Sequence, residues 1–324
     1  MAQDLDSKLA FIIGHYKSGS TWLAHILSLH RGVRGVRETH VFRYLDEGRT
    51  QESVSRVLFS KSAWGAGGVA NFPRYWASEI TRSARVKLGL ATGTAALPAS
   101  DIPSTMHDLG IMRQFFIRNK LNRTQNDEEY CRMFFTTLID TLGPNDYLVE
   151  KTPTNVFHIE SIRRIFPESK LISCHRDGRD VVISDKHHLK REYGKTESFS
   201  KRVLKWKKAM RAEMDQAEKF AIHQLSYESL KAEPKETVEK LLNYLKLDFD
   251  SSVLEEMISG ASFKAMSGGR SSGDEDASKF YRKGVVGDWR NKFSEAEIKT
   301  FSDIAGELLV ELGYEASPNW QRWS

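Results

Sequence analysis

A glycine-rich turn near the N-terminus is the first segment whose residue types and spacing could do chemistry. Residues 14–21 read GHYKSGST and stand between an apolar run, Leu9–Ile13, and a segment with apolar residues at helical spacing. In a turn between a strand and a helix, backbone N–H groups and the helix N-terminus bind anions. The pattern therefore predicts a phosphate-type site. An ordinary strand-to-helix turn is the alternative, because Gly, Ser and Lys favour such turns as well.

The position of the lysine decides which phosphate chemistry this turn fits. The spacing from Gly14 to Gly19 equals that of a Walker A loop, but Ser20 stands where the nucleotide-binding lysine should follow, and the lysine is at position 17. A nucleotide kinase would therefore lack its ligand for the β- and γ-phosphates. A P-loop nucleotide kinase remains an alternative that this arrangement disfavours.

The same turn resembles the 5′-phosphosulfate loop of the sulfotransferase family. It continues as KSGSTWL, where the family usually has PKSGTTWL, so that Tyr16 replaces the proline and Ser20 a threonine. The resemblance implies 3′-phosphoadenosine 5′-phosphosulfate (PAPS) as a sulfuryl donor and co-substrate, with no tightly bound cofactor and no metal. The residues that it assigns to the donor here are Lys17, Ser18, Gly19, Ser20, Thr21 and Trp22.

A donor with a 3′-phosphate needs a second anion site, and the segment LISCHRDGRDVVIS matches the one that the family uses. In the family an arginine at a strand end is followed eight residues later by a serine; here these are Arg176 and Ser184, with Gly178 where proline is common. Arg176 offers a planar fork for a phosphate, and Ser184 adds a hydroxyl about two turns into the following helix. A surface ion-pair cluster would be the alternative if this segment stood alone.

Three later segments match the family's remaining donor motifs in the expected order: LSYESL, SFKAM and YRKGVVGDW. The residues that the resemblance implies are Tyr227 and Phe263 at the adenine, and Arg282, Lys283 and Gly284 at the 3′-phosphate. The family places Phe263 and Trp22 on opposite faces of the adenine, and core packing is the alternative for each of these two rings. Five ordered elements from residue 11 to residue 293 carry the resemblance.

Transfer of a sulfuryl group to a hydroxyl needs charge stabilisation at the leaving phosphate oxygen and a base at the acceptor. Lys17, with the amides of its turn, is the candidate for the first task. Small-molecule members of the family carry a histidine in a Lys-Thr-His segment. Here the segment EKTPT retains Lys151, a further catalytic candidate, but has Pro153 in place of that histidine.

The base must therefore come from another segment, and VRETHVF resembles the glutamate-bearing segment of carbohydrate and tyrosylprotein sulfotransferases. Glu38 is the first candidate, because partial desolvation beside bound anions can raise a carboxyl pKa towards neutrality. His40 is the second candidate. A solvated acid paired with Arg37 is the alternative interpretation of Glu38.

Strand and helix patterns alternate along the chain, which predicts an α/β protein with a central parallel sheet flanked by helices on both faces. The resemblance implies the P-loop NTPase-like sulfotransferase fold. Expected strands lie at 9–13, 147–149, 171–174 and 222–225, and expected helices at 21–29, 159–166, from 179, 198–220, 234–245 and 294–312. We expect one domain, residues 1–324, in which 60–130 forms an acceptor cap and 264–284 a mobile loop over the donor.

Charge and composition limit the classes of partner that this chain could have. Residues 163–211 hold fifteen Lys and Arg against six Asp and Glu, in a chain whose net charge is +5. The helix within this stretch could be a nucleic-acid-binding module, but Arg176 and Arg179 favour a focusing field for an anionic small donor. We expect no membrane span and a cytoplasmic location, in which Cys131 and Cys174 stay reduced. The expected acceptor is a hydroxyl-bearing metabolite, lipid or sugar. The oligomeric state stays open.

Overall fold

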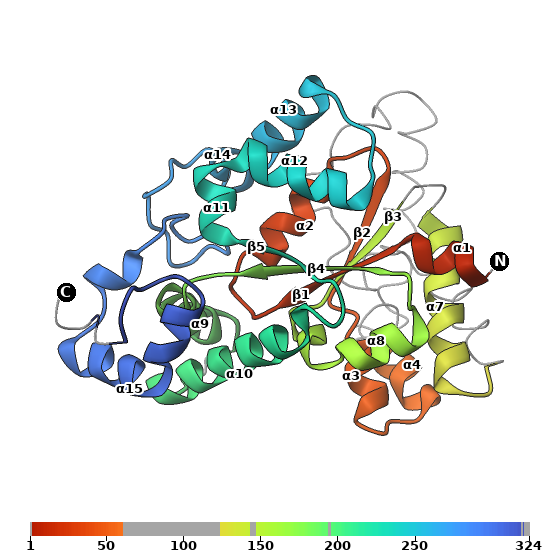
Figure 1. Cartoon of the computed structure of the whole chain (residues 1–324), viewed down its shortest axis with the longest axis horizontal. Helices are drawn as coiled ribbons and strands as arrows, with labels where there is room; N and C mark the ends of the chain where they lie inside the picture. Colours follow the sequence, from red (N-terminus) through yellow and green to blue (C-terminus); the bar gives the residue numbers. More distant parts are fainter. Residues whose placement is uncertain (1, 61–123, 143–146, 194–195, 319, 321–324) are drawn as a thin grey trace, which may run out of the picture. The chain divides into compact units, whose positions relative to one another are not determined.

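The computed structural model describes residues 2–60, 124–142, 147–193, 196–318 and 320 (Figure 1). Most of the expected acceptor cap, 60–130, lies outside these residues. The chain forms two compact units: residues 1–11 with 24–170, and residues 12–23 with 171–324. None of the helices in the described ranges is long and apolar enough to cross a membrane.

Five parallel strands form the central sheet in the order β2-β3-β1-β4-β5, which confirms the predicted α/β fold class. Their bounds are β1 Leu9–Gly14, β2 Val33–Arg37, β3 Tyr147–Lys151, β4 Lys170–His175 and β5 His223–Ser226. Strand β2 was not predicted, because five residues with two arginines and a glycine carry no apolar run. Its pairing with β3, from Val33 opposite Tyr147 to Arg37 opposite Lys151, makes it a strand.

The expected helices are present within a few residues of their predicted ends. The α-helices are α1 Ala2–Ser7, α2 Ser20–Ser28, α3 Val41–Asp46, α4 Gln51–Ser60, α7 Asp127–Leu142, α8 Ile159–Ile165, α9 Gly178–Tyr193, α10 Phe199–Ala217, α11 Tyr227–Ala232, α12 Pro234–Leu245, α13 Ser251–Gly260, α14 Phe263–Met266 and α15 Glu295–Glu311. The 3-10 helices are η3 Pro153–Phe157 and η4 Asp288–Asn291. Local chemistry explains several of the starts: the side chains of Ser198 and Ser294 cap α10 and α15, and Pro234 opens α12.

Four phenylalanines cluster in the core of the unit that contains β2 and β3. The ring of Phe11 on β1 lies 5.5 Å from that of Phe42, 5.4 Å from that of Phe135 and 6.0 Å from that of Phe166. All four are fully or almost fully buried. Phe42 belongs to α3, which starts directly after His40, so this cluster anchors the chain just beyond the predicted base segment.

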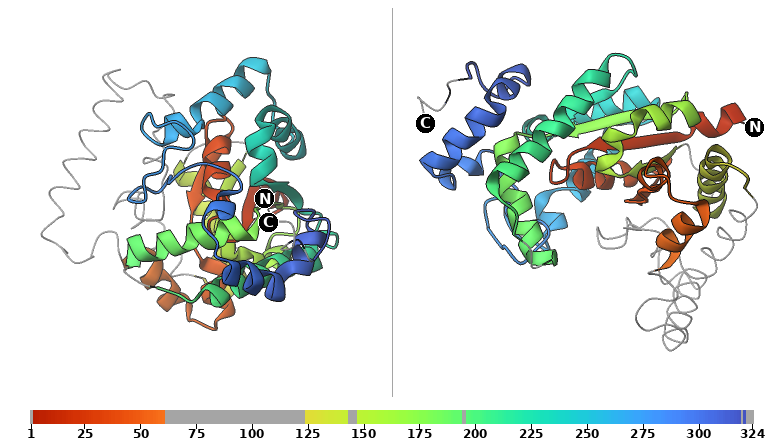
Figure 2. Two further views of the ribbon diagram at one scale, coloured as in Figure 1. Left: turned by 90° about the vertical axis from the view of Figure 1, so that its left-hand side faces the viewer. Right: turned by 90° about the horizontal axis from the view of Figure 1, so that it is seen from below.

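In the other unit, α10 and α12 lie on opposite sides of β4 and β5 (Figure 1; Figure 2). Helix α10 packs along α15 through the rings of Trp206 and Phe301, whose centroids are 5.6 Å apart. The basic side chains of α10 take part in this packing. Lys207 donates to the carbonyl of Ile304 at 2.6 Å, and Arg211 forms an ion pair with Glu311. Two of the six basic side chains of this helix therefore serve helix packing, which argues against a nucleic-acid stripe.

Candidate active site

The glycine-rich turn between β1 and α2 has a backbone that favours glycine at two positions. Gly14 and Gly19 have φ values of 135° and 100°. A Cβ at Gly14 would lie 3.0 Å from the carbonyl oxygen of Cys174, and one at Gly19 would lie 2.7 Å from Cδ2 of Tyr227. Both glycines therefore let the turn approach neighbouring chain segments closely.

Lys17 takes a left-handed conformation in this turn, with a φ of 69°. Its ammonium lies 4.4 Å from the centroid of the Phe280 ring, a cation–π distance. Ser18 is fully buried, and its Oγ has no hydrogen-bond partner within the described part of the chain. A strained lysine and an unpartnered buried hydroxyl fit a turn that is arranged to meet a ligand.

Tyr227, the first residue of α11, is where several predicted donor residues meet. Its buried ring lies 5.4 Å from that of Trp22, and the guanidinium carbon of Arg176 lies 4.2 Å above it. The same ring contacts the backbone at Gly19. Burial raises the pKa of Tyr227, so the phenol stays neutral. Residues from two separate motifs of the sequence thus converge on this aromatic side chain, which belongs to a third.

Arg176 directly follows β4 and is held from several sides. Its Nη2 donates to Asp180 at 3.2 Å and to the carbonyl of Val285 at 2.9 Å. Its own carbonyl accepts from Nε1 of Trp206 at 3.2 Å. The Trp206 ring also explains the glycine that stands in place of proline, because a Cβ at Gly178 would lie 2.4 Å from this ring. Ser184 lies on α9 and is half-buried.

The segment 282–284 brings two further cations into the same unit. Arg282 and Lys283 each donate to Asp288 at 2.6 Å, and Arg282 also pairs with Glu275. Burial alone would raise the pKa of Asp288, but the hydrogen bonds from Lys283 and Arg282 hold it below its usual value. Two acids thus hold the two cations that the family motif assigns to the 3′-phosphate.

Phe263 packs against the third residue of this segment. Gly284 has a φ of 66°, and a Cβ there would lie 2.3 Å from Cδ2 of Phe263. Trp22 is anchored two residues before Phe263, since its Nε1 donates to the carbonyl of Ala261 at 2.7 Å. The expected mobile loop is tied together by Arg270, which donates to the carbonyls of Tyr281, Arg282 and Asp274. Its mobility stays a prediction.

Arg179 differs from Arg176 in its surroundings. It is almost fully buried, is paired with Asp177 and Glu315, and lies over the rings of Trp289 and Trp320 at 4.0 and 4.6 Å. Its charge is therefore neutralised inside the protein. This arginine packs the fold and contributes little to a field for an anionic donor.

The predicted base segment lies in the unit that contains β2 and β3. Glu38 and Lys151 form an ion pair at 2.6 Å, in which the lysine side chain is 2% exposed and the glutamate 38%. The Glu38 N–H also donates to the Lys151 carbonyl at 2.7 Å. Glu38 and His40 both have left-handed backbones, with φ values of 57° and 54°. Strained non-glycine residues of this kind are frequent at functional sites.

His40 is the second base candidate, and burial lowers its pKa from the ordinary value, so the imidazole is neutral near pH 7. Its Nδ1 has no hydrogen-bond partner in the described ranges. His158, by contrast, pairs with Asp46 at 2.6 Å where α8 begins. That contact joins the start of α8 to the end of α3.

Glu150 was missed by sequence reasoning, although it is a fully buried acid of this unit. It is 0% exposed and accepts hydrogen bonds from the backbone and hydroxyl of Thr39 at 3.2 and 2.9 Å, from the hydroxyl of Thr152, and from Asn155 at 2.9 Å. Burial raises its pKa to about 7. The signal that could have revealed it is a glutamate within a buried strand, next to Lys151 and followed by hydroxyl and amide residues.

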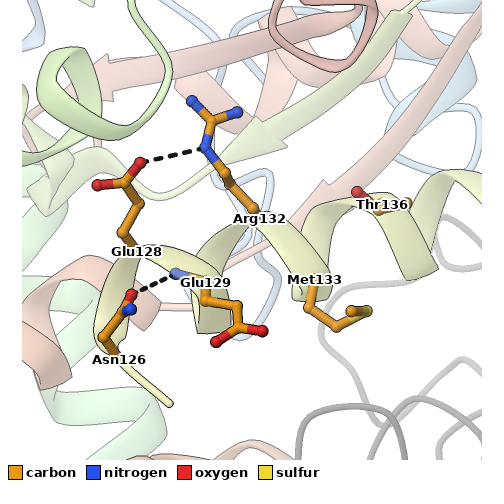
Figure 3. A pocket seen from close by; sticks show the side chains of 6 residues that line it. All are labelled: Asn126, Glu128, Glu129, Arg132, Met133 and Thr136. Carbon is orange, nitrogen blue, oxygen red and sulfur yellow. Dashed lines mark hydrogen bonds and ion pairs between the residues drawn. The ribbon is translucent and has the colours of Figure 1, made fainter. Parts of the chain in front are cut away.

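A hollow on α7 carries none of the predicted site residues (Figure 3). Its lining comes from one helix and the residue before it. Arg132 is paired with Glu128 at 3.4 Å, and the side chain of Asn126 accepts from the backbone of Glu129 at 2.9 Å. This hollow has no arrangement of groups that suggests chemistry.

A parallel α/β sheet with a glycine-rich turn after its central strand is the architecture of the P-loop-like α/β fold. The model of the sulfotransferase family matches residues 10–251, and the chain belongs to this family. Mouse sulfotransferase 1 family member D1 is 26% identical over 157 residues, which cover 42% of this chain and 53% of that protein. The match therefore spans about half the length of such curated relatives.

Solved structures agree on the fold. The sulfotransferase domain from the curacin biosynthetic pathway superposes with a TM-score of 0.54 at 17% identity, covering 92% of this chain and 96% of that one. Mouse sulfotransferase SULT7A1, solved with PAP, gives a TM-score of 0.51 at 14% identity, covering 94% and 88%. At these identities the likeness establishes the fold alone.

Proposed function

We propose that this protein transfers a sulfuryl group from PAPS to a hydroxyl acceptor. The observation that carries the proposal is that three donor motifs meet at one side chain: Tyr227, of the third motif, lies against Gly19 and Trp22 of the first and Arg176 of the second. The related mouse protein SULT7A1 was solved with PAP, adenosine 3′,5′-bisphosphate, which is the product that PAPS leaves behind.

Each part of the donor has a matching group in residues 12–23 and 171–324. The 5′-phosphosulfate suits the turn that contains Lys17, Ser18, Gly19, Ser20 and Thr21. The adenine suits the aromatic rings of Trp22, Tyr227 and Phe263. The 3′-phosphate suits Arg176, Ser184, Arg282, Lys283 and Gly284. Arg282 and Lys283 would exchange part of their contact with Asp288 and Glu275 for the phosphate, since a dianion attracts both cations more strongly than a shared carboxylate.

The reaction is an in-line displacement at sulfur. The acceptor oxygen forms a bond to sulfur while the bond from sulfur to the 5′-phosphate oxygen breaks, and negative charge grows on that leaving oxygen. Lys17 and the backbone N–H groups of its turn stabilise this charge. Preorganised donors of this kind supply a large share of the rate when little covalent chemistry falls to the protein.

The acceptor proton goes to Glu38 in this proposal. The hydrogen bond from the Lys151 ammonium at 2.6 Å fixes the glutamate. His40 is the alternative base, since a neutral imidazole can also accept a proton. Lys151 itself is largely enclosed and serves to orient the carboxylate.

The acceptor is proposed to be a small hydroxyl-bearing metabolite, lipid or sugar, and the cytoplasm the site of action.

No observation favours the nucleotide kinase or the nucleic-acid-binding module. The lysine after the second glycine is absent, and basic side chains of α10 are engaged with α15.

Calorimetric titration with PAP and transfer of radiolabelled sulfate from PAPS to a panel of simple alcohols and phenols test the proposal. Lys17→Ala is expected to reduce transfer on the order of a hundredfold, the usual effect of removing one transition-state donor. Lys208→Ala, at an exposed position of α10, is the matched control and should retain wild-type transfer. Absence of PAP binding by the wild-type protein, or full transfer by Lys17→Ala, would refute the proposal.

A further inference from the structure

We propose that Asp180 is a positioning residue that joins the two halves of the 3′-phosphate site, so that its carboxylate makes the protein selective for a donor with a 3′-phosphate. The inference rests on the proposed function. No motif assigns a role to this residue, which lies on the first turn of α9 and whose side chain is 0% exposed.

Three donors surround the Asp180 carboxylate: one is four residues earlier in the chain, and two belong to the distant segment 287–289. Its Oδ2 accepts from Nη2 of Arg176 at 3.2 Å and from the backbone N–H of Gly287 at 2.8 Å. Its Oδ1 accepts from the backbone N–H of Trp289 at 3.0 Å. Both oxygens are thus satisfied, as a buried carboxylate requires. The donors lie up to 109 residues away in sequence.

The first consequence concerns Arg176. A guanidinium is planar, so fixing one of its nitrogens from Asp180 and from the Val285 carbonyl orients the whole group. The Nε of this arginine is buried and has no partner within the described residues. This N–H group can therefore donate a hydrogen bond to a further acceptor, and a phosphate oxygen is such an acceptor.

The second consequence concerns the segment with the other two cations. The N–H groups that Asp180 binds belong to Gly287 and Trp289, the residues on either side of Asp288. Asp288 in turn holds Arg282 and Lys283 at 2.6 Å each. Asp180 therefore fixes the backbone that carries the anchor of both cations. Through this one carboxylate the position of Arg176 is tied to that of Arg282 and Lys283.

A positioning role and a purely structural role of Asp180 predict different effects on ligand binding. If Asp180 only held the fold together, its replacement would weaken all donor analogues alike. If it aligns the cations for the 3′-phosphate, its replacement should weaken ligands that carry this phosphate and spare those that lack it. Adenosine 3′,5′-bisphosphate and adenosine 5′-phosphate differ in this group alone and are the probes.

The experiment measures the dissociation constants of both nucleotides by calorimetry for the wild-type protein and for Asp180→Asn, which keeps the size and loses the charge. We expect the affinity of Asp180→Asn for the bisphosphate to fall about tenfold to a hundredfold, as for a lost charge-assisted hydrogen bond, with the affinity for adenosine 5′-phosphate nearly unchanged. The control is Asp185→Asn, a buried acid of the same helix that interacts with Lys205 and Arg202 of α10. It should keep the wild-type ratio of the two affinities.

Each outcome of this experiment supports or overturns the inference. A wild-type protein that does not prefer the bisphosphate would overturn the proposed function, and the inference with it. A preference that persists in Asp180→Asn, or an equal loss for both nucleotides, would overturn the inference and leave the proposed function standing. If circular dichroism shows that Asp180→Asn does not fold, Asp180→Glu, which keeps the charge and displaces it by one methylene, is measured instead against the same two criteria.

Discussion

Glu150 gives the sharpest quantitative prediction, because the protein encloses a carboxyl group that titrates near neutral pH. Burial raises its pKa from 4.5 to about 7. Since one pKa unit corresponds to ~1.4 kcal/mol, this difference links about 3 kcal/mol of unfolding free energy to pH. The folded state binds the proton more tightly than the unfolded state. This contribution is therefore complete below pH 4.5 and is lost as the pH rises to 7.

The test replaces the carboxyl by a group that cannot ionise. Glu150→Gln keeps the size of the side chain, and the amide that it introduces finds an acceptor if Asn155 turns over its own amide, because the Asn155 Oδ1 is buried without a partner in the described structure. The variant should therefore resemble the protonated wild-type protein. Relative to wild type, its unfolding free energy should rise by about 3 kcal/mol between pH 4.5 and pH 7.5.

Urea unfolding at several pH values in this range measures the difference between variant and wild type, so that all other titrating groups cancel. Glu255→Gln, at an exposed position of α13, is the control for the removal of one carboxyl group. A pH-independent difference between Glu150→Gln and wild type would show that burial does not control this carboxyl, and the reasoning would fail.

Two further substitutions test the turn and the base. Gly19→Ala places a Cβ 2.7 Å from Cδ2 of Tyr227, so thermal unfolding should occur at lower temperature and PAP affinity should fall about tenfold or more. Gly48 also has a positive φ but no atom within 4 Å of a Cβ, so Gly48→Ala measures the backbone strain alone. Equal effects of the two substitutions would argue against the close contact. Glu38→Gln should reduce sulfate transfer by roughly a hundredfold or more and leave PAP affinity unchanged, as expected for a general base; near wild-type turnover would shift the role to His40.

The elements and the donor motifs could be predicted because their signals are local. An apolar run before Gly14, apolar residues at helical spacing after Gly19, and Pro234 at a helix start each reflect the conformational preferences of a few neighbouring residues. Strand β2 was missed for the same reason. Its five residues have little strand signal of their own, and their conformation depends on hydrogen bonds to β3, more than a hundred residues later.

The amino-acid sequence by itself determined the fold class and most strands of the sheet, and it predicted which residues bind an anionic donor. Only the tertiary structure decided which charged groups work together. Thr39 reaches Glu150 across 111 residues, and Asp180 reaches Trp289 across 109. The physical reason is burial: an acid that is exposed in the unfolded chain gains a fixed set of partners and a shifted pKa only when folding removes water and supplies distant donors. No local pattern records those partners.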